Sequence, residues 1–354
     1  MDEIRIKKRV IGRLPKCYSI APLTWDGRSY FLVAAEKKDP CYLFDLEGNQ
    51  ADTVWEGPGG VMSMVQVPGS DGVFLSTRKF YSPNDGADAE IAVARPGKKG
   101  GWETHCLVKL PFVHRFDILQ RGEEMYLIAC TLKSAHAYKD DWRSPGKVYG
   151  ARLPEELLVP GAHRRLKLKV IKDGMRKNHG YCRTKEEGGQ AAVISCEDGI
   201  YEFIPPCRDG DWEVRRLSEM SASDAVFVDL DGDGERELGV IAPFHGDRVS
   251  ILKRIEGEYR EVYRYPEPAK FAHAIYGGSF CGREAFLFGH REGKMGLAAV
   301  FYNRERQKYE EIMIDSGRGP ANIYCYEREG KSCLVAANRE TDEIALYEAE
   351  IGSQ

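Results

Sequence analysis

The sequence lacks long apolar runs, closely paired cysteines and a large net charge. No hydrophobic stretch approaches the roughly twenty residues that a membrane helix needs, so no membrane partner is expected. The 10 cysteines lie mostly inside apolar runs and form no CxxC pair, which argues against a zinc ribbon and favours buried, reduced thiols. The net charge of −4 predicts no nucleic-acid partner.

Common enzyme signatures are also missing. The chain contains no GxSxG, Walker, GxGxxG, HExxH or kinase motif, so hydride transfer with a nucleotide cofactor and serine chemistry both lose support. The charged N-terminal residues include no apolar signal segment, and we therefore expect a cytoplasmic protein. No linker or low-complexity tract interrupts residues 1–354, which predicts a single domain. The sequence does not indicate an oligomeric state.

What the sequence does contain is a repeat. A polar residue, an apolar run, a tight turn and a second apolar run recur at intervals of roughly forty-five to sixty-five residues, the scale of a four-stranded propeller blade. The first runs begin at Tyr18, Met62, His114, His179, Asp224, His273 and Asn322. This pattern predicts an all-β fold, a seven-bladed β-propeller of four-stranded blades. The 37 glycines and 17 prolines suit the many turns of such a fold.

The repeat also predicts unit boundaries. The later units are expected at 165–207, 212–254, 259–303 and 309–349. Residues 4–10 form an orphan apolar-polar strand ahead of the first unit. Because a closed ring leaves no open sheet edge, we expect this N-terminal strand to complete the last blade.

An acidic hairpin interrupts the fifth repeat. Asp229, Asp231 and Asp233 stand at alternate positions, Gly234 permits a sharp turn, and Glu237 can close a coordination sphere. The flanking apolar runs are typical of strands, which excludes an EF-hand. An all-oxygen set of this kind predicts a structural Ca²⁺ site that pins the hairpin.

Histidines gather at equivalent places in the repeat. The start of a first strand and the end of the antiparallel second strand lie on the same face, and five of the 8 histidines fall at these two places. They are His114, His179 and His273 at first-strand starts, and His245 and His290 at second-strand ends. A single histidine at a strand end is commonly a polar cap, but five equivalent ones predict a channel ion, Zn, Mn, Fe or Ni.

Other candidate residues surround the same predicted mouth. A long interruption from Lys133 to Gly146 carries His136 and Tyr138, which are candidate acid/base groups. Arg78 is a candidate for assisting a leaving group, and the alternative for each basic residue is a solvated rim. The candidate substrate-binding residues are Glu36, Lys79, Arg115 and Arg339.

Two resemblances follow from these motifs. The Asp-Leu-Asp-Gly-Asp-Gly-Glu-Arg-Glu-Leu segment at 229–238 resembles the FG-GAP/VCBS repeats of seven-bladed propellers, which fix fold better than function. The layout of channel histidines with one acidic hairpin resembles the propeller domain of the aldos-2-ulose dehydratases, lyases that act on keto-sugars. This resemblance implies a channel metal held by some of the five histidines and a separate structural cation at the hairpin. Asn322 and Met62 depart from it, since they stand where ligands are possible.

Two functions remain open from the sequence. The first is a metal-dependent carbon-oxygen lyase that eliminates a β-substituent from a keto-sugar or oxidised glycoside, with isomerisation as a variant of the same chemistry. The second is a non-catalytic propeller that binds a sugar or serves as a protein-interaction scaffold. Both readings expect a small carbohydrate or partner at the mouth, and only the first needs a transition metal.

Overall fold

Strands make up almost all of the regular structure in the computed structural model, which describes residues 4–159, 166–208 and 210–352. A short 3-10 helix, η1 (Glu155–Leu158), lies between two of the strands. Within the described ranges, no helix is long and apolar enough to span a membrane. The chain divides into two compact units, unit 1 (Met1–Tyr18 and Ala222–Gln354) and unit 2 (Ser19–Ser221).

Unit 1 contains three four-stranded antiparallel sheets. The strand orders are β18-β19-β20-β21, β22-β23-β24-β25 and β1-β28-β27-β26. The strands of the first two sheets are β18 (Asp224–Val228), β19 (Glu237–Ala242), β20 (Arg248–Ile255), β21 (Glu258–Arg264), β22 (Ala272–Phe280), β23 (Arg283–His290), β24 (Leu297–Asn303) and β25 (Lys308–Asp315). The third sheet consists of β26 (Pro320–Arg328), β27 (Lys331–Asn338), β28 (Glu343–Ile351) and β1 (Ile4–Arg13).

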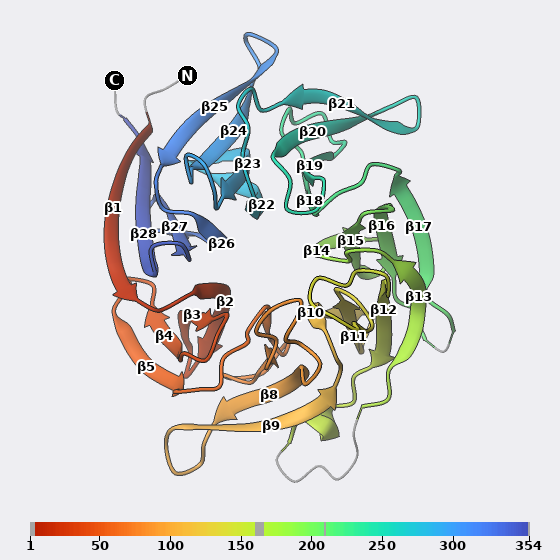
Figure 1. Ribbon diagram of the computed structural model, residues 1–354. Coiled ribbons are helices and arrows are strands. Elements are labelled where there is room, and N and C mark those ends of the chain that lie inside the picture. Colours follow the sequence, from red (N-terminus) through yellow and green to blue (C-terminus); the bar gives the residue numbers. More distant parts are fainter. Residues whose placement is uncertain (1–3, 160–165, 209, 353–354) are drawn as a thin grey trace. The chain divides into compact units, whose positions relative to one another are not determined.

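The N-terminal strand occupies its predicted place. Strand β1 runs antiparallel to β28, with Ile4 opposite Ile351 and Arg13 opposite Glu343. Figure 1 shows the two strands side by side, red against blue. The prediction that this strand completes the last sheet is confirmed. The pairing joins the two ends of the chain in one sheet and covers the outer edge of β28.

Unit 2 contains two four-stranded sheets and one eight-stranded sheet. The strands of the four-stranded sheets are β2 (Cys17–Trp25), β3 (Arg28–Ala35), β4 (Cys41–Asp45), β5 (Gln50–Trp55), β6 (Met64–Gln66), β7 (Phe74–Arg78), β8 (Glu90–Pro96) and β9 (Trp102–Lys109). The larger sheet consists of β10 (Val113–Arg121), β11 (Glu124–Thr131), β12 (Gly146–Arg152), β13 (Lys169–Met175), β14 (Gly180–Glu186), β15 (Gly189–Cys196), β16 (Gly199–Ile204) and β17 (Glu213–Ser218). Its two halves, β10 to β13 and β14 to β17, are linked in the described residues at the pair Arg121 and Gly189.

The strands of one sheet differ in how deeply they are buried. All six residues of β19 are buried, whereas β21, at the edge of the same sheet, is mostly exposed. Second strands therefore read as continuous apolar runs, and outer strands read as polar segments. The apolar side chains of neighbouring sheets pack into cores, for example Leu32, Leu43 and Phe74 in unit 2.

The predicted unit boundaries at 165, 212, 259 and 309 are wrong by one strand. Each placed a polar outer strand at the beginning of the next unit, but the strand pairs with the sheet before it. Thus β13 pairs with β12, β17 with β16, β21 with β20, and β25 with β24. Outer strands expose most of their side chains and carry little hydrophobic signal, so no sequence pattern attaches them to the preceding apolar run.

Gly239 in β19 leaves room for a phenylalanine of another sheet. A Cβ at this position would lie 2.4 Å from Cδ2 of Phe286 in β23, which is fully buried. We expect Gly239→Ala to lower the free energy of unfolding by about 1–3 kcal/mol, because the ring cannot move without disturbing a packed core. Chemical denaturation measures this change. Adding Phe286→Leu should recover part of the loss, and an unchanged midpoint for the single variant would contradict the packing.

Candidate functional site

Two of the three predicted first-strand histidines, His114 and His273, stand on β-bulges. In β10 the pairing skips His114, and in β22 it skips His273, so that each is an extra residue that opposes no partner on the second strand. In β26 the skipped residue is Ala321. The position equivalent to the two histidines is therefore Ala321 and not the predicted Asn322. A bulge changes the direction of a side chain at the end of a strand. Such positions are common beside binding and catalytic sites.

Tyr18 and His273 form a buried hydrogen-bonded pair in unit 1. The Nδ1 atom of His273 lies 2.7 Å from the carbonyl oxygen of Ala321, and its Nε2 atom lies 2.9 Å from the Tyr18 hydroxyl. A carbonyl only accepts, so Nδ1 carries the proton, Nε2 is the acceptor and Tyr18 is the donor. The side-chain amide of Asn322 donates to the Tyr18 carbonyl at 2.8 Å. Both rings are at most 3% exposed.

His245 lies beside this pair. Its ring centroid is 5.6 Å from that of His273, and it packs against Phe244 at 3.9 Å and Phe271 at 4.3 Å. Its backbone φ of 50° lies in the left-handed region, and its N–H donates to the hydroxyl of Ser223 at 3.3 Å. A left-handed residue other than glycine costs about 1 kcal/mol or more, so the surrounding contacts hold His245 in this place.

Unit 2 contains a second histidine pair. His114 and His179 are buried, and their ring centroids are 4.5 Å apart with the planes tilted by 36°. His179 precedes β14, where its N–H donates to the carbonyl of Ser195. Phe80 packs edge-on against His114 at 5.3 Å. Two imidazoles this close can direct nitrogen ligands to one metal ion.

His290 is bonded within its own turn. Its Nδ1 donates to the carbonyl of Glu292 at 2.9 Å, and its Nε2 accepts from the N–H of Gly296 at 3.0 Å. Burial lowers the pKa of His290, which favours the neutral ring that these two bonds require. Both nitrogens are therefore used by the turn after β23. In this arrangement His290 offers no lone pair to a metal ion, and its role as a ligand stays a prediction.

Arg78 bonds within its own sheet region. Its guanidinium donates to the hydroxyl of Thr104 at 3.1 Å and to the carbonyl of Pro58 at 3.3 Å. It also lies over the ring of Trp55, with Cζ 5.3 Å from the centroid. Burial lowers the pKa of Arg78, although nearby acidic groups oppose this effect. These contacts tie strands together, and the predicted catalytic role stays a prediction.

The four predicted substrate-binding residues each have a bonding partner nearby on the protein. The contacts are Lys79 Nζ to Glu90 Oε1 (2.9 Å), Arg115 Nη1 to the Met62 carbonyl (2.6 Å), Glu36 Oε1 to Lys37 Nζ (3.3 Å) and Arg339 Nη1 to Glu340 Oε1 (2.8 Å). Substrate binding would have to compete with these bonds. Their role in binding stays a prediction.

The long loop between β11 and β12 is held by buried charges. The Lys133 ammonium donates to the carbonyl of Asp141 at 2.8 Å and lies 4.2 Å from the Trp142 ring. Tyr138 is 57% exposed and stacks against Arg143. The ring of His136 packs edge-on against Phe112 at 5.4 Å. Its Nδ1 is buried without a hydrogen-bond partner among the described residues.

The acidic hairpin brings three of its four predicted ligands together. Ligand atoms of Asp229, Asp231 and Glu237 lie within 4.8 Å of one another. Both carboxylate oxygens of Asp229 accept backbone N–H groups of the loop, from Gly232 at 2.8 Å and from residue 234 at 3.2 Å. Burial raises the pKa of Glu237 to about 7. The calcium site stays a prediction.

The hairpin also contains a cation that the sequence did not suggest. The ammonium of Lys253, from β20, bonds to the carboxylates of Asp231 and Asp233, the latter at 2.6 Å. It lies 3.5 Å from Oε1 of Glu237. Asp233 therefore faces a lysine on the protein itself. Lys253 stands in an ordinary polar-apolar strand, so no sequence signal links it to the hairpin.

Tyr18 is the functional candidate that sequence reasoning missed. It was identified as the start of a first strand, but it was assigned no chemistry. Its contact with His273 spans 255 residues of sequence. The available signal was its position, which is equivalent to those of the histidines in the repeat.

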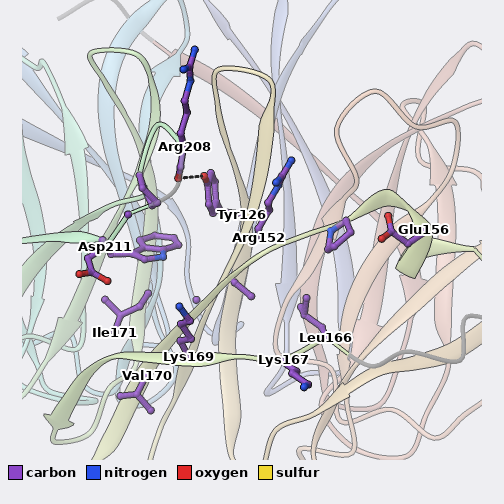
Figure 2. Close-up of a pocket in the computed structure, with 16 residues that line it drawn as sticks. Tyr126, Arg152, Glu156, Leu166, Lys167, Lys169, Val170, Ile171, Arg208 and Asp211 are labelled. Atoms are coloured by element: carbon purple, nitrogen blue, oxygen red, sulfur yellow. Dashed lines mark hydrogen bonds between the residues drawn. The ribbon is translucent and has the colours of Figure 1, made fainter.

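A cavity of about 940 Å³ in unit 2 is separate from all predicted site residues. Its lining includes the aromatic rings of Tyr126 and Trp212 and the cationic side chains of Arg152, Lys167 and Lys169. Figure 2 shows Tyr126, Arg152, Lys167 and Lys169 among the lining residues. It also shows the hydrogen bond from the Tyr126 hydroxyl to the Arg208 carbonyl, which is 3.2 Å long. An aromatic wall beside cations suits a sugar or an anionic ligand.

Comparison with solved structures shows the fold. No family model and no curated protein matches this chain. Similar structures include a streptogramin B lyase, with 14% identity, 98% of each chain covered and a TM-score of 0.57. The β-propeller domain of Cps50 (Swd1) from Myceliophteria thermophila has 9% identity, covers 96% of this chain and 99% of its own, and gives a TM-score of 0.60.

The Dos1 propeller is similar at 6% identity, with 95% of this chain and 78% of that chain covered and a TM-score of 0.57. Identities this low show the fold alone, and the chain therefore has a β-propeller fold. The prediction of an all-β propeller is confirmed. The count of seven blades, the FG-GAP/VCBS type and the resemblance to the aldos-2-ulose dehydratases stay predictions.

Proposed function

We propose that this protein is a metal-dependent carbon-oxygen lyase that eliminates a β-substituent from a keto-sugar or an oxidised glycoside, with Tyr18 and His273 as its acid–base pair. The observation that carries the proposal is the chain of hydrogen bonds from the Tyr18 hydroxyl through His273 to the Ala321 carbonyl. This arrangement orients one imidazole lone pair at a phenol, as general acid–base catalysis requires. The alternative role for the pair is to tie strands together.

The proton movements of the elimination can be assigned to these two residues. The Tyr18 oxygen takes the proton from the carbon next to the sugar carbonyl, while its own proton passes to Nε2 of His273. A carbon–carbon double bond forms as the bond from the β-carbon to its oxygen breaks. Tyr18 then protonates the departing oxygen and recovers its proton from His273, so the enzyme returns to its initial state. The Ala321 carbonyl holds the imidazole in one orientation throughout.

Two histidines of unit 2, His114 and His179, are candidate ligands for a metal ion. They are buried imidazoles with ring centroids 4.5 Å apart, a donor type that suits Zn, Mn, Fe or Ni. A divalent ion, when bound to this pair, would supply a Lewis acid. The sequence also predicts His245, His273 and His290 as ligands, and those assignments stay predictions. His273 is assigned to proton transfer, because Nε2 already accepts from Tyr18.

Metal analysis of the tag-free protein tests the proposal that the lyase holds a transition metal. We expect about one transition-metal ion per chain in the wild type, measured by inductively coupled plasma mass spectrometry. A His114→Ala/His179→Ala variant should lose this metal by about tenfold or more, because it removes both imidazoles. His105→Ala is the control, since His105 lies in the outer strand β9 (Trp102–Lys109). Equal metal content in all three proteins would refute the assignment.

Activity is then measured on a panel of keto-sugars by the absorbance of the enone product. Turnover that depends on the metal supports the lyase. Absence of both a transition metal and turnover favours the second candidate, a non-catalytic sugar-binding propeller. The observation that supports this second candidate is the unit 2 cavity, which is lined by Trp212 and Tyr126 together with lysine and arginine side chains.

A further inference from the structure

The acidic hairpin between β18 and β19 is neutralised by a lysine. Lys253 reaches into it from β20 and contacts Asp231, Asp233 and Glu237. An ammonium has three protons, and here it faces three carboxylates. These are three of the four groups on which a calcium ion would depend. A calcium ion and the Lys253 ammonium therefore compete for the same oxygens.

The burial of Glu237 makes a neutralising cation important for the stability of the hairpin. The Glu237 side chain is fully buried, and its Oε2 accepts the N–H of Leu230 at 2.8 Å. Its Oε1 has no hydrogen-bond partner in the part of the chain that the structure describes, and it faces Lys253 at 3.5 Å. A buried carboxylate without a compensating charge is strongly unfavourable. The hairpin thus needs a cation, and the chain itself provides one.

The charges around the hairpin also fit an internal cation. The side chains of Lys253 and Asp231 are 21% and 15% exposed, so this pair is mostly buried, whereas Asp233 is 47% exposed. Asp229, the remaining predicted ligand, uses both oxygens to hold the backbone of the turn. The loop therefore keeps its shape through hydrogen bonds of its own.

We propose that Lys253 is the resident cation of this hairpin, that the wild-type hairpin folds without a divalent ion, and that removal of the ammonium opens a Ca²⁺ site. The proposal replaces the calcium predicted from the sequence with a side chain. It is independent of the lyase, because it concerns neither histidine pair and uses no activity measurement.

The test is the thermal midpoint, Tm, of the full chain in EDTA and in about 1 mM CaCl₂, with MgCl₂ as the ion control. The wild type should show the same Tm in EDTA, in CaCl₂ and in MgCl₂. Lys253→Met keeps the length of the side chain and removes its charge. Its Tm should fall in EDTA and rise by about 5 °C or more with calcium, because an ion that binds only the folded state stabilises it.

Matched variants separate charge from packing. Lys294→Met removes an exposed lysine that pairs with Glu267 in the same unit, and it should not respond to calcium. Lys253→Arg keeps a cation and should resemble the wild type. A wild-type Tm that falls in EDTA and returns with calcium would overturn the proposal. So would a folded Lys253→Met protein that calcium does not stabilise.

Lys253→Gln repeats the test if the Met variant does not fold. The wild-type measurement needs no variant at all. Direct calcium titration by calorimetry should give no heat of binding with the wild type and a one-site isotherm with the charge-free variant.

Discussion

Tyr18→Phe is expected to lower kcat by about 100-fold or more on the keto-sugar that the wild type converts. The phenol is the group that contacts Nε2 of His273, and its removal leaves no atom to carry the proton between the substrate and the imidazole. General acid–base catalysis typically contributes about 10²–10⁴-fold, which sets the size of the loss. KM should change little, since the ring remains. Steady-state kinetics measure both constants.

A structural role for Tyr18 predicts a different result. The lost hydrogen bond leaves a buried nitrogen acceptor and costs about 1–3 kcal/mol of stability in either case. If the bond only ties strands together, kcat at a temperature well below the Tm stays within about twofold of the wild type, and the lyase proposal loses its acid–base pair. Tyr276→Phe is the control, because its hydroxyl donates only to the backbone carbonyl of Ser279.

Asp117→Ala is expected to be the most destabilising single change in unit 2 among those considered. The buried Asp117 carboxylate accepts two bonds from the guanidinium of Arg183, one of them 2.8 Å long, and a 2.7 Å bond from the Tyr181 hydroxyl. It also accepts the N–H of Ile118. The network joins β10 to β14, the first strands of the two halves of the eight-stranded sheet.

Removal of the carboxylate leaves Arg183 and Tyr181 without their shared acceptor. Because the Arg183 side chain is 41% exposed and can take up water, we expect a loss of about 2–3 kcal/mol, below the roughly 3–5 kcal/mol of a fully buried pair. Urea denaturation monitored by tryptophan fluorescence gives the value. Asp173→Ala breaks the exposed pair with Lys147 and should cost at most about 0.5 kcal/mol. Equal losses in the two variants would contradict this role for Asp117.

The apolar parts of the fold were predictable from the sequence, and the polar parts were not. Second strands such as β19 are buried along their whole length and stand out as apolar runs, so their ends could be placed to within a few residues. Outer strands such as β13 expose most of their residues and gave no comparable signal. They were therefore attached to the wrong neighbour.

In the candidate site, too, only the residues next to apolar runs could be placed from the sequence. His114 and His273 were located correctly as first-strand starts, because an apolar run follows each. The shift from Asn322 to Ala321 was not predictable, since a bulge adds one residue to one strand and leaves no mark in the composition. The partners of Tyr18 and Lys253 depend on side chains that meet only after the sheets have packed.

The recurring bulge separates the identity of a side chain from the integrity of its sheet. The extra residue is histidine in β10, histidine in β22 and alanine in β26, yet the strand pairing on either side follows the same pattern each time. A residue that opposes no partner can be exchanged without breaking a ladder of hydrogen bonds. Mutation can therefore sample new chemistry at these places one repeat at a time, while the framework that folds the chain stays constant. The fold thus contains positions at which the side chain can change while the strand pairing on either side stays the same.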